Sequence, residues 1–184
     1  MCYVNTTYEE TMTRSRDDFA HIDTGSAPKL EMIRRQIRYI NSNVSKESLT
    51  GYCIGLPGAG LQAERHRDEY RAYGIPDDRQ VMVDYSYDVH WTQEHYMKKL
   101  NYEGKIIRGN LVDVVQDYWN KGKQVDIIDY DGVSHLEYEH EQLIENAAKH
   151  NVKVIILVVT NRCSKLSGFH EWWKRDLGLT KRYI

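Results

Sequence analysis

Short apolar runs alternate with amphipathic segments along most of the chain. In the first amphipathic segment, apolar residues recur three and four positions apart, which predicts a helix with one face on a core. The apolar runs are rich in valine and isoleucine, as buried strands are. The predicted strands are residues 52–54, 81–85, 105–110, 125–131 and 152–160, and the predicted helices are 27–41, 61–73, 88–100, 111–120 and 136–150.

Strands and helices that alternate in this way form parallel βαβ units, with helices on both faces of the sheet. Crossovers in such units are right-handed, and a ligand crevice opens where the strand order reverses. The sequence therefore predicts an α/β fold of the doubly wound, Rossmann-like type, with a mainly parallel sheet in the order 3-2-1-4-5. Residues 1–26 lack periodicity and are expected to be an irregular lead-in, whereas residues 27–184 are expected to form a single domain.

Composition and charge narrow the class of protein. The formal net charge is -2, so no global field draws the chain to nucleic acid or to an anionic membrane. No apolar run approaches the roughly 20 residues of a membrane span, and no signal peptide is evident, so we expect a cytoplasmic protein. The three cysteines have no paired spacing, and the histidines form no complete ligand set, so no metal site is predicted.

Glycine and acidic residues follow the first two predicted strands, at the edge where ligands bind to such sheets. Gly55, Gly58 and Gly60 form a turn ahead of the next helix, where backbone N–H groups can face a ligand. The second strand ends in Asp84 and Tyr85. A carboxylate about 20 residues beyond a glycine turn suits both hydroxyl groups of a ribose.

The third and fourth strands also end in polar residues. Asn110 follows the third strand, and its amide can both donate and accept, as an adenine edge requires. Asp129 and Asp131 end the fourth strand on the same side, where either can accept a proton or bind a metal. Other roles stay open, because Asp84 and Asp129 also suit helix capping and Asn110 suits a turn.

This order of glycine turn, acid, amide and acid resembles the Rossmann-like (class I) methyltransferases that use S-adenosylmethionine, over about residues 28–160. In that family the glycine turn wraps the methionine part of the cofactor, the second-strand acid holds the ribose, and a polar residue after the third strand faces adenine. The resemblance implies methyl transfer, with Asp129 and Asp131 as candidates for the proton acceptor. The cofactor-binding residues that it implies are Gly55, Gly58, Gly60, Asp84, Tyr85, Asn110 and Asp129.

The fourth-strand segment is most similar to tRNA guanine dimethyltransferases and related phage and archaeal proteins, which carry an acid-x-acid-proline-aromatic signature there. Gly132 and Val133 replace the proline and the aromatic residue, and Ile54 stands where the family has an acid before the glycine turn. The resemblance implies nucleic acid as one candidate acceptor, and the host cytoplasm as the compartment if the protein is viral.

The chain after the fifth predicted strand departs from the family, which closes its sheet with two further antiparallel strands. Residues 161–184 are too few for a full terminal hairpin and a substrate domain. One interpretation is a minimal methyltransferase that docks on its substrate or forms a homodimer. The other is a non-catalytic, methyltransferase-like module of viral or mobile-element origin that binds a nucleotide or a protein.

Residues 129–132 also match the acid-x-acid-glycine opening of magnesium-dependent phosphatases of the haloacid dehalogenase type. There the first acid is a nucleophile and the second is a general acid. That family places the motif on an early strand and needs further hydroxyl, lysine and acidic residues downstream, and this set is not evident after Asp131. The methyltransferase interpretation therefore comes first.

Overall fold

The structure is a computed structural model and describes residues 27–131 and 138–158. These residues form a five-stranded sheet in the order β3-β2-β1-β4-β5. Every neighbouring pair of strands is parallel, which confirms the predicted fold class and strand order. The strands are β1 (Tyr52–Gly55), β2 (Gln80–Asp84), β3 (Lys105–Arg108), β4 (Val125–Asp131) and β5 (Val154–Val158).

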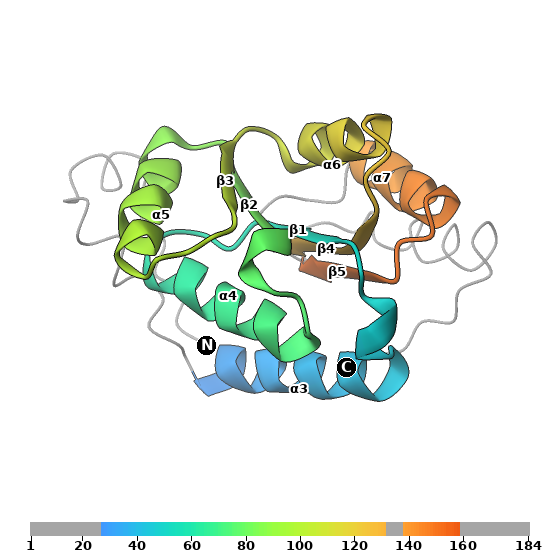
Figure 1. The fold of residues 1–184 in the computed structure, drawn as a ribbon, viewed down its shortest axis with the longest axis horizontal. Coiled ribbons are helices and arrows are strands. Elements are labelled where there is room, and N and C mark those ends of the chain that lie inside the picture. The colour runs from blue at the N-terminus through green and yellow to red at the C-terminus, as the bar shows by residue number, and fades with distance from the viewer. Residues whose placement is uncertain (1–26, 132–137, 159–184) are drawn as a thin grey trace, which may run out of the picture.

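Helices cover both faces of this sheet (Figure 1). The helices are α3 (Ala27–Asn43), α4 (Leu61–Tyr73), α5 (Tyr87–Lys99), α6 (Leu111–Asn120) and α7 (Tyr138–Lys149), with the short 3-10 turns η1 (Lys46–Ser48) and η2 (Asp77–Arg79). α4 and α5 pack on one face and α3 packs on α4, while α6 and α7 lie on the opposite face. This arrangement is the doubly wound architecture that alternating strands and helices predict.

The element boundaries agree closely with the sequence pattern. α4 and α6 have the predicted bounds, and α5 begins one residue earlier than predicted. β3 ends at Arg108, before Gly109 and Asn110, because Asn110 caps α6 instead of continuing the strand. The predicted lead-in 1–26, the end of the fifth predicted strand and the chain beyond it lie outside the described residues.

Two apolar cores lie on the two faces of the sheet, because successive side chains of a strand point to opposite faces. On β1, Cys53 packs toward α4 and α3, and the next residue, Ile54, packs toward α6. On β4, Ile127 and Ile128 divide in the same way. This alternation also decides which polar side chains at the strand ends can meet.

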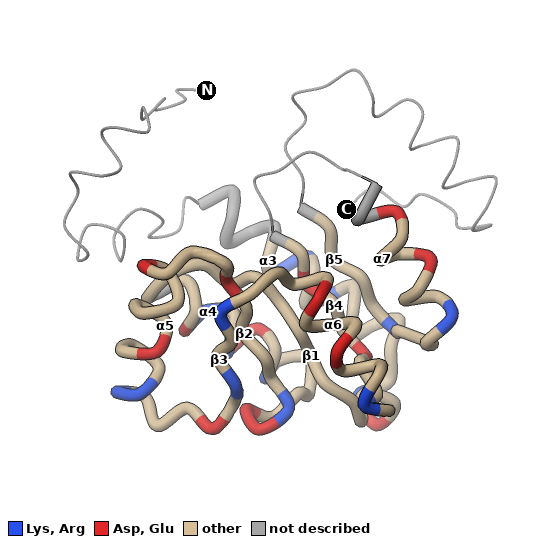
Figure 2. The backbone as a smooth tube through the Cα atoms, turned by 90° about the horizontal axis from the view of Figure 1, so that it is seen from above, with Lys and Arg blue, Asp and Glu red and all other residues tan. Residues whose placement is uncertain are grey.

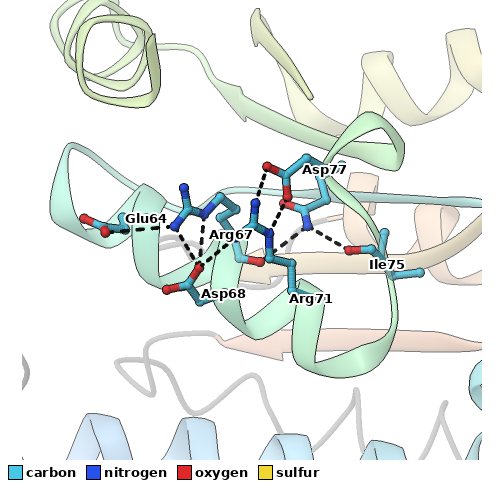
Figure 3. Close-up of polar contacts among 7 residues, drawn as sticks. Glu64, Arg67, Asp68, Arg71, Ile75 and Asp77 are labelled. Carbon is cyan, nitrogen blue, oxygen red and sulfur yellow. Dashed lines mark hydrogen bonds and ion pairs between the residues drawn. The ribbon is translucent and has the colours of Figure 1, made fainter. Parts of the chain in front are cut away.

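Polar contacts fix α4 against the start of β2 (Figure 3). The Arg71 guanidinium donates two hydrogen bonds, of 2.6 and 2.8 Å, to the carboxylate of Asp77. The buried Gln80 amide donates to the Ile75 carbonyl at 2.9 Å. These bonds hold the α4–β2 connection, so the two elements that border the glycine turn and Asp84 keep a fixed spacing.

Charged residues of both signs are interspersed along the described backbone (Figure 2). They lie mainly on helices and loops, and the centres of the strands carry other residue types. Within residues 27–131 and 138–158, no helix has the length and apolar character needed to cross a lipid bilayer.

Candidate functional site

A cavity of about 300 Å³ opens at the carboxyl ends of β1, β2 and β3. Parallel pairing places these three strand ends side by side, so residues distant in sequence meet at one edge. Four of the residues that the sequence analysis assigned to a cofactor line this cavity. The lining residues are Leu56, Gly58, Asp84, Tyr85, Gly109, Asn110, Leu111 and Tyr130.

Asp84 is half-buried at the end of β2, and its Oδ1 accepts a hydrogen bond of 2.8 Å from the Ser86 backbone N–H. Ser86 is the N-cap of α5, so this bond forms a turn just before the helix and is not a side-chain cap of a helical N–H. Burial raises the pKa of Asp84, whereas the Ser86 bond and His90 act in the opposite direction. Since the carboxylate has two oxygens, this turn and a contact with a ligand hydroxyl are compatible.

Asn110 is the N-cap of α6, and its Oδ1 accepts a hydrogen bond of 2.8 Å from the Val112 N–H. The capping bond uses the side-chain oxygen, so the amide NH₂ can serve as the donor for a ligand. Tyr85 is 80% exposed and also lines the cavity, which gives a ligand an aromatic face at the rim.

The glycine turn joins β1 to α4. Gly58 has a φ of +75° and Gly60 a φ of 49°, values that L side chains rarely adopt. Gly60 is the N-cap of α4 and provides no side-chain cap, so the first backbone N–H groups of the helix are left without that partner. Gly58 reaches the cavity, whereas Gly60 does not line it.

Gly55 has a different role in the structure. A Cβ at this position would lie 2.1 Å from the Tyr70 hydroxyl and 3.1 Å from the Asp129 Cβ. The missing side chain therefore leaves space for Tyr70, and Gly55 is not among the residues that line the cavity.

Asp129 faces α4 on the opposite side of β4 from Tyr130, and it is 2% exposed. Its Oδ2 accepts a hydrogen bond of 2.9 Å from the Tyr70 hydroxyl and lies 3.1 Å from His66 Nδ1. The structure therefore does not bring Asp129 to the cavity that holds Asp84. Asp131 is the last residue of β4, and its side chain lies outside the described residues.

A buried polar cluster surrounds Asp129 and was not identified from the sequence. His66 Nδ1 lies 3.7 Å from the carboxylate of Glu69, which accepts a hydrogen bond from the Tyr73 hydroxyl. Burial raises the pKa of Tyr70, and Asp129 adds to that increase. These helical residues occur three and four positions apart, so the helical period could have placed them on the face of α4 that meets the sheet.

Leu56 and Tyr130 line the cavity and were also not assigned from the sequence. Tyr130 lies between two acids, and strand alternation turns its side chain away from the face that buries Asp129. Of the residues of β4 whose side chains the structure describes, Tyr130 reaches the cavity and the predicted Asp129 does not.

A second cavity, of about 530 Å³, lies against α5 and the start of β3. Trp91 and His95 stack beside it with ring centroids 5.2 Å apart. None of the residues predicted for the cofactor lines it, and it is not at the carboxyl edge of the sheet, so the smaller cavity is the better candidate site. Among the described residues, no group of three or more metal-binding side chains is placed to hold an ion.

Comparisons with protein-family models, curated proteins and solved structures found no match to this chain.

Proposed function

We propose that this protein binds S-adenosylmethionine in the strand-end cavity and transfers its methyl group to an acceptor. One observation carries the proposal. Gly58, Asp84, Tyr85 and Asn110, which were assigned to the cofactor from three separate strand ends, line a single cavity.

The lining residues fit the chemistry of this cofactor. The Asp84 carboxylate can accept hydrogen bonds from ribose hydroxyl groups, and the Asn110 amide can donate to adenine. Leu56, Leu111 and Tyr130 offer apolar surface for a base. Among the described residues that line the cavity, one is acidic and none is Lys or Arg, which favours a ligand without phosphate.

The cofactor, when bound, supplies a methyl group on a positively charged sulfur, so the protein mainly orients the reactants. Asp84 and Asn110 hold the nucleoside, and a base must take a proton from a neutral acceptor. Asp131, the last residue of β4, is the candidate for this base on the resemblance alone. The proposed acceptor is nucleic acid, on the resemblance of the fourth-strand segment alone.

A non-catalytic binding module is the second candidate function. The observation that favours it is the engagement of Asp129 with His66 and Tyr70, which removes one of the two predicted catalytic acids from the cavity. The same burial argues against the phosphatase interpretation, because a nucleophilic carboxylate must reach its substrate.

A ligand panel tests the proposal directly. We would measure thermal unfolding with S-adenosylmethionine, S-adenosylhomocysteine, ATP and NAD. A ligand at 100 times its Kd stabilises the folded state by about 2.7 kcal/mol, so specific binding is visible as a higher Tm. Stabilisation by S-adenosylhomocysteine but not by ATP or NAD supports the proposal, and stabilisation by none of the four contradicts it. Incubation with methyl-labelled cofactor and RNA, DNA and protein fractions then separates an enzyme from a binding module.

Asp84→Asn is expected to weaken S-adenosylhomocysteine binding at least about tenfold at neutral pH. The substitution keeps the Ser86 bond, because an amide oxygen also accepts, but it replaces charge-assisted bonds to the ribose, each worth about 1.5–3 kcal/mol, by neutral ones. Isothermal titration calorimetry measures the change. Asp113→Asn, at an exposed acid in the first turn of α6, is the matched control and should bind like the wild type.

The same pair of proteins gives a pH test. Because burial raises the pKa of Asp84, protonation of the wild type should abolish ribose binding at a pH above the ordinary value of 3.8. Affinity is therefore retained above the raised pKa and lost as the pH falls through it. Asp84→Asn should lack this transition, and an identical pH profile in both proteins would assign Asp84 only to the turn before α5.

A further inference from the structure

The α5 helix connects the two polar walls of the strand-end cavity. Its N-cap, Ser86, donates to Asp84 at the end of β2. Two helical turns later, Gln93 donates from Nε2 to the Gly58 carbonyl oxygen at 2.7 Å. One rigid helix therefore contacts both the acidic wall and the glycine turn.

Gln93 is fully buried, and only one half of its amide is paired in the described part of the chain. Its exposed fraction is 0%, and its Oε1 has no hydrogen-bond partner among the described residues. A buried acceptor without a partner destabilises a fold. Methionine has a similar length and would fill this position without that cost, so the specific contribution of glutamine here is the N–H donor to Gly58.

Gly58 needs such an external restraint. Its φ of +75° is accessible to glycine, but glycine also has many other conformations, so the turn is not fixed by its own residue type. A Cβ at Gly58 would displace the end of the flexible Gln62 side chain, and the positive φ would strain any L residue there, so a bulkier residue is a poor source of rigidity. The hydrogen bond from Gln93 selects one conformation of the turn that lines the cavity.

We infer that Gln93 is a positioning residue for the ligand site: it holds the Gly58 carbonyl and thereby sets the distance between the glycine turn and Asp84. This inference rests on the proposed function, because it takes the cavity as the cofactor site. Gln93 itself does not line the cavity and acts through Gly58.

Gln93→Met tests the inference. Gln116→Met on α6 is the control, because it makes the same chemical change at a side chain that donates to Asn120 of its own helix. We expect Gln93→Met to change the Tm little, because the loss of the bond to Gly58 and the removal of a buried unpaired oxygen act in opposite directions. We expect it to weaken S-adenosylhomocysteine binding at least tenfold, and to speed hydrogen exchange of the backbone amides at residues 58–60 in the free protein. Gln116→Met should change none of these three quantities.

Two outcomes would overturn the inference. One is unchanged affinity together with unchanged amide exchange, and the other is a large loss of Tm, which would make Gln93 a packing residue. If Gln93→Met fails to fold, Gln93→Glu provides a second test, because a protonated carboxyl can donate to Gly58 and an ionised one cannot. The protection of residues 58–60, taken relative to the intrinsic exchange rate at each pH, should then rise toward acid pH in Gln93→Glu and not in the wild type.

Failure of the proposed function remains distinguishable from failure of this inference. If the wild type binds none of the four ligands, the methyltransferase proposal is wrong. The exchange rates at residues 58–60 still decide whether Gln93 orders the turn, since that measurement needs no ligand.

Discussion

Gly55→Ala is expected to lower the free energy of unfolding by about 3 kcal/mol or more, because the new methyl group would overlap the Tyr70 hydroxyl. The built Cβ lies 2.1 Å from that oxygen, and the Tyr70 side chain is 0% exposed and has no space to retreat. Moving Tyr70 would also break its bond to the buried Asp129 carboxylate. Urea denaturation followed by circular dichroism measures the loss.

Tyr70→Phe should rescue much of this defect, because it removes the atom that the new methyl group meets. In a double-mutant cycle, the cost of Gly55→Ala should be clearly smaller in the Tyr70→Phe background than in the wild type. Gly109→Ala is the matched control, since a Cβ there meets only Val114 at an ordinary 3.6 Å. Equal costs for Gly55→Ala in both backgrounds would show that Tyr70 does not require this glycine.

The sheet could be predicted from the sequence because its signals are local and repeated. The β-branched run of β4 and the helical period of α6 each specify one element, and the right-handed crossover rule then fixes the strand order. The boundary of β3 was harder to place. The predicted strand continued to Asn110. In the structure the Asn110 side chain caps α6, so the strand ends before it.

Of the residues that the sequence assigned to the site, Asp84 and Asn110 line the cavity and Asp129 does not, and this difference has a physical cause. Asp84 and Asn110 lie at the extreme ends of their elements, where position along the strand is sufficient to place them at the edge. Asp129 is two residues before the end of β4, and its register with Gly55 places it below the edge. Its burial depends on His66 and Tyr70 of α4. The local sequence patterns of β4 and α4 do not show that these two segments meet.

Gly55, at the end of β1, has two possible explanations in the sequence. A glycine at the end of β1 fits close approach by a cofactor, and it also fits close approach by a neighbouring side chain. The structure supports the second for Gly55, while Gly58, three residues further, lines the cavity. A glycine-rich turn can therefore contain one glycine that packing requires and another that lines a cavity. The contacts with the neighbouring helix show which glycine is which.

Asp129→Ala is expected to destabilise the protein by about 3–5 kcal/mol, the usual cost of removing one partner from a buried charged cluster. Asp129 is 2% exposed, and its loss removes the acceptor for Tyr70 and the close contact of His66 Nδ1. Glu69, whose carboxylate lies 3.7 Å from His66 Nδ1, would remain beside the imidazole. Urea denaturation at neutral pH measures the change.

Asp117→Ala is the control for Asp129→Ala, because Asp117 is an exposed acid paired with Lys121 at 2.6 Å, and surface pairs of this kind contribute less than about 1 kcal/mol. The comparison also decides the role of Asp129 in the proposed reaction. A structural acid should lower methyl transfer only in proportion to the unfolded fraction, and excess S-adenosylmethionine, which binds the folded state and donates the methyl group, should restore both folding and activity. A catalytic acid would instead leave a stable protein, with a Tm close to that of the wild type, that binds cofactor and does not turn over. That result would mean that Asp129 leaves its contacts with His66 and Tyr70 during the reaction, and the strand-end cavity would then extend beneath β4.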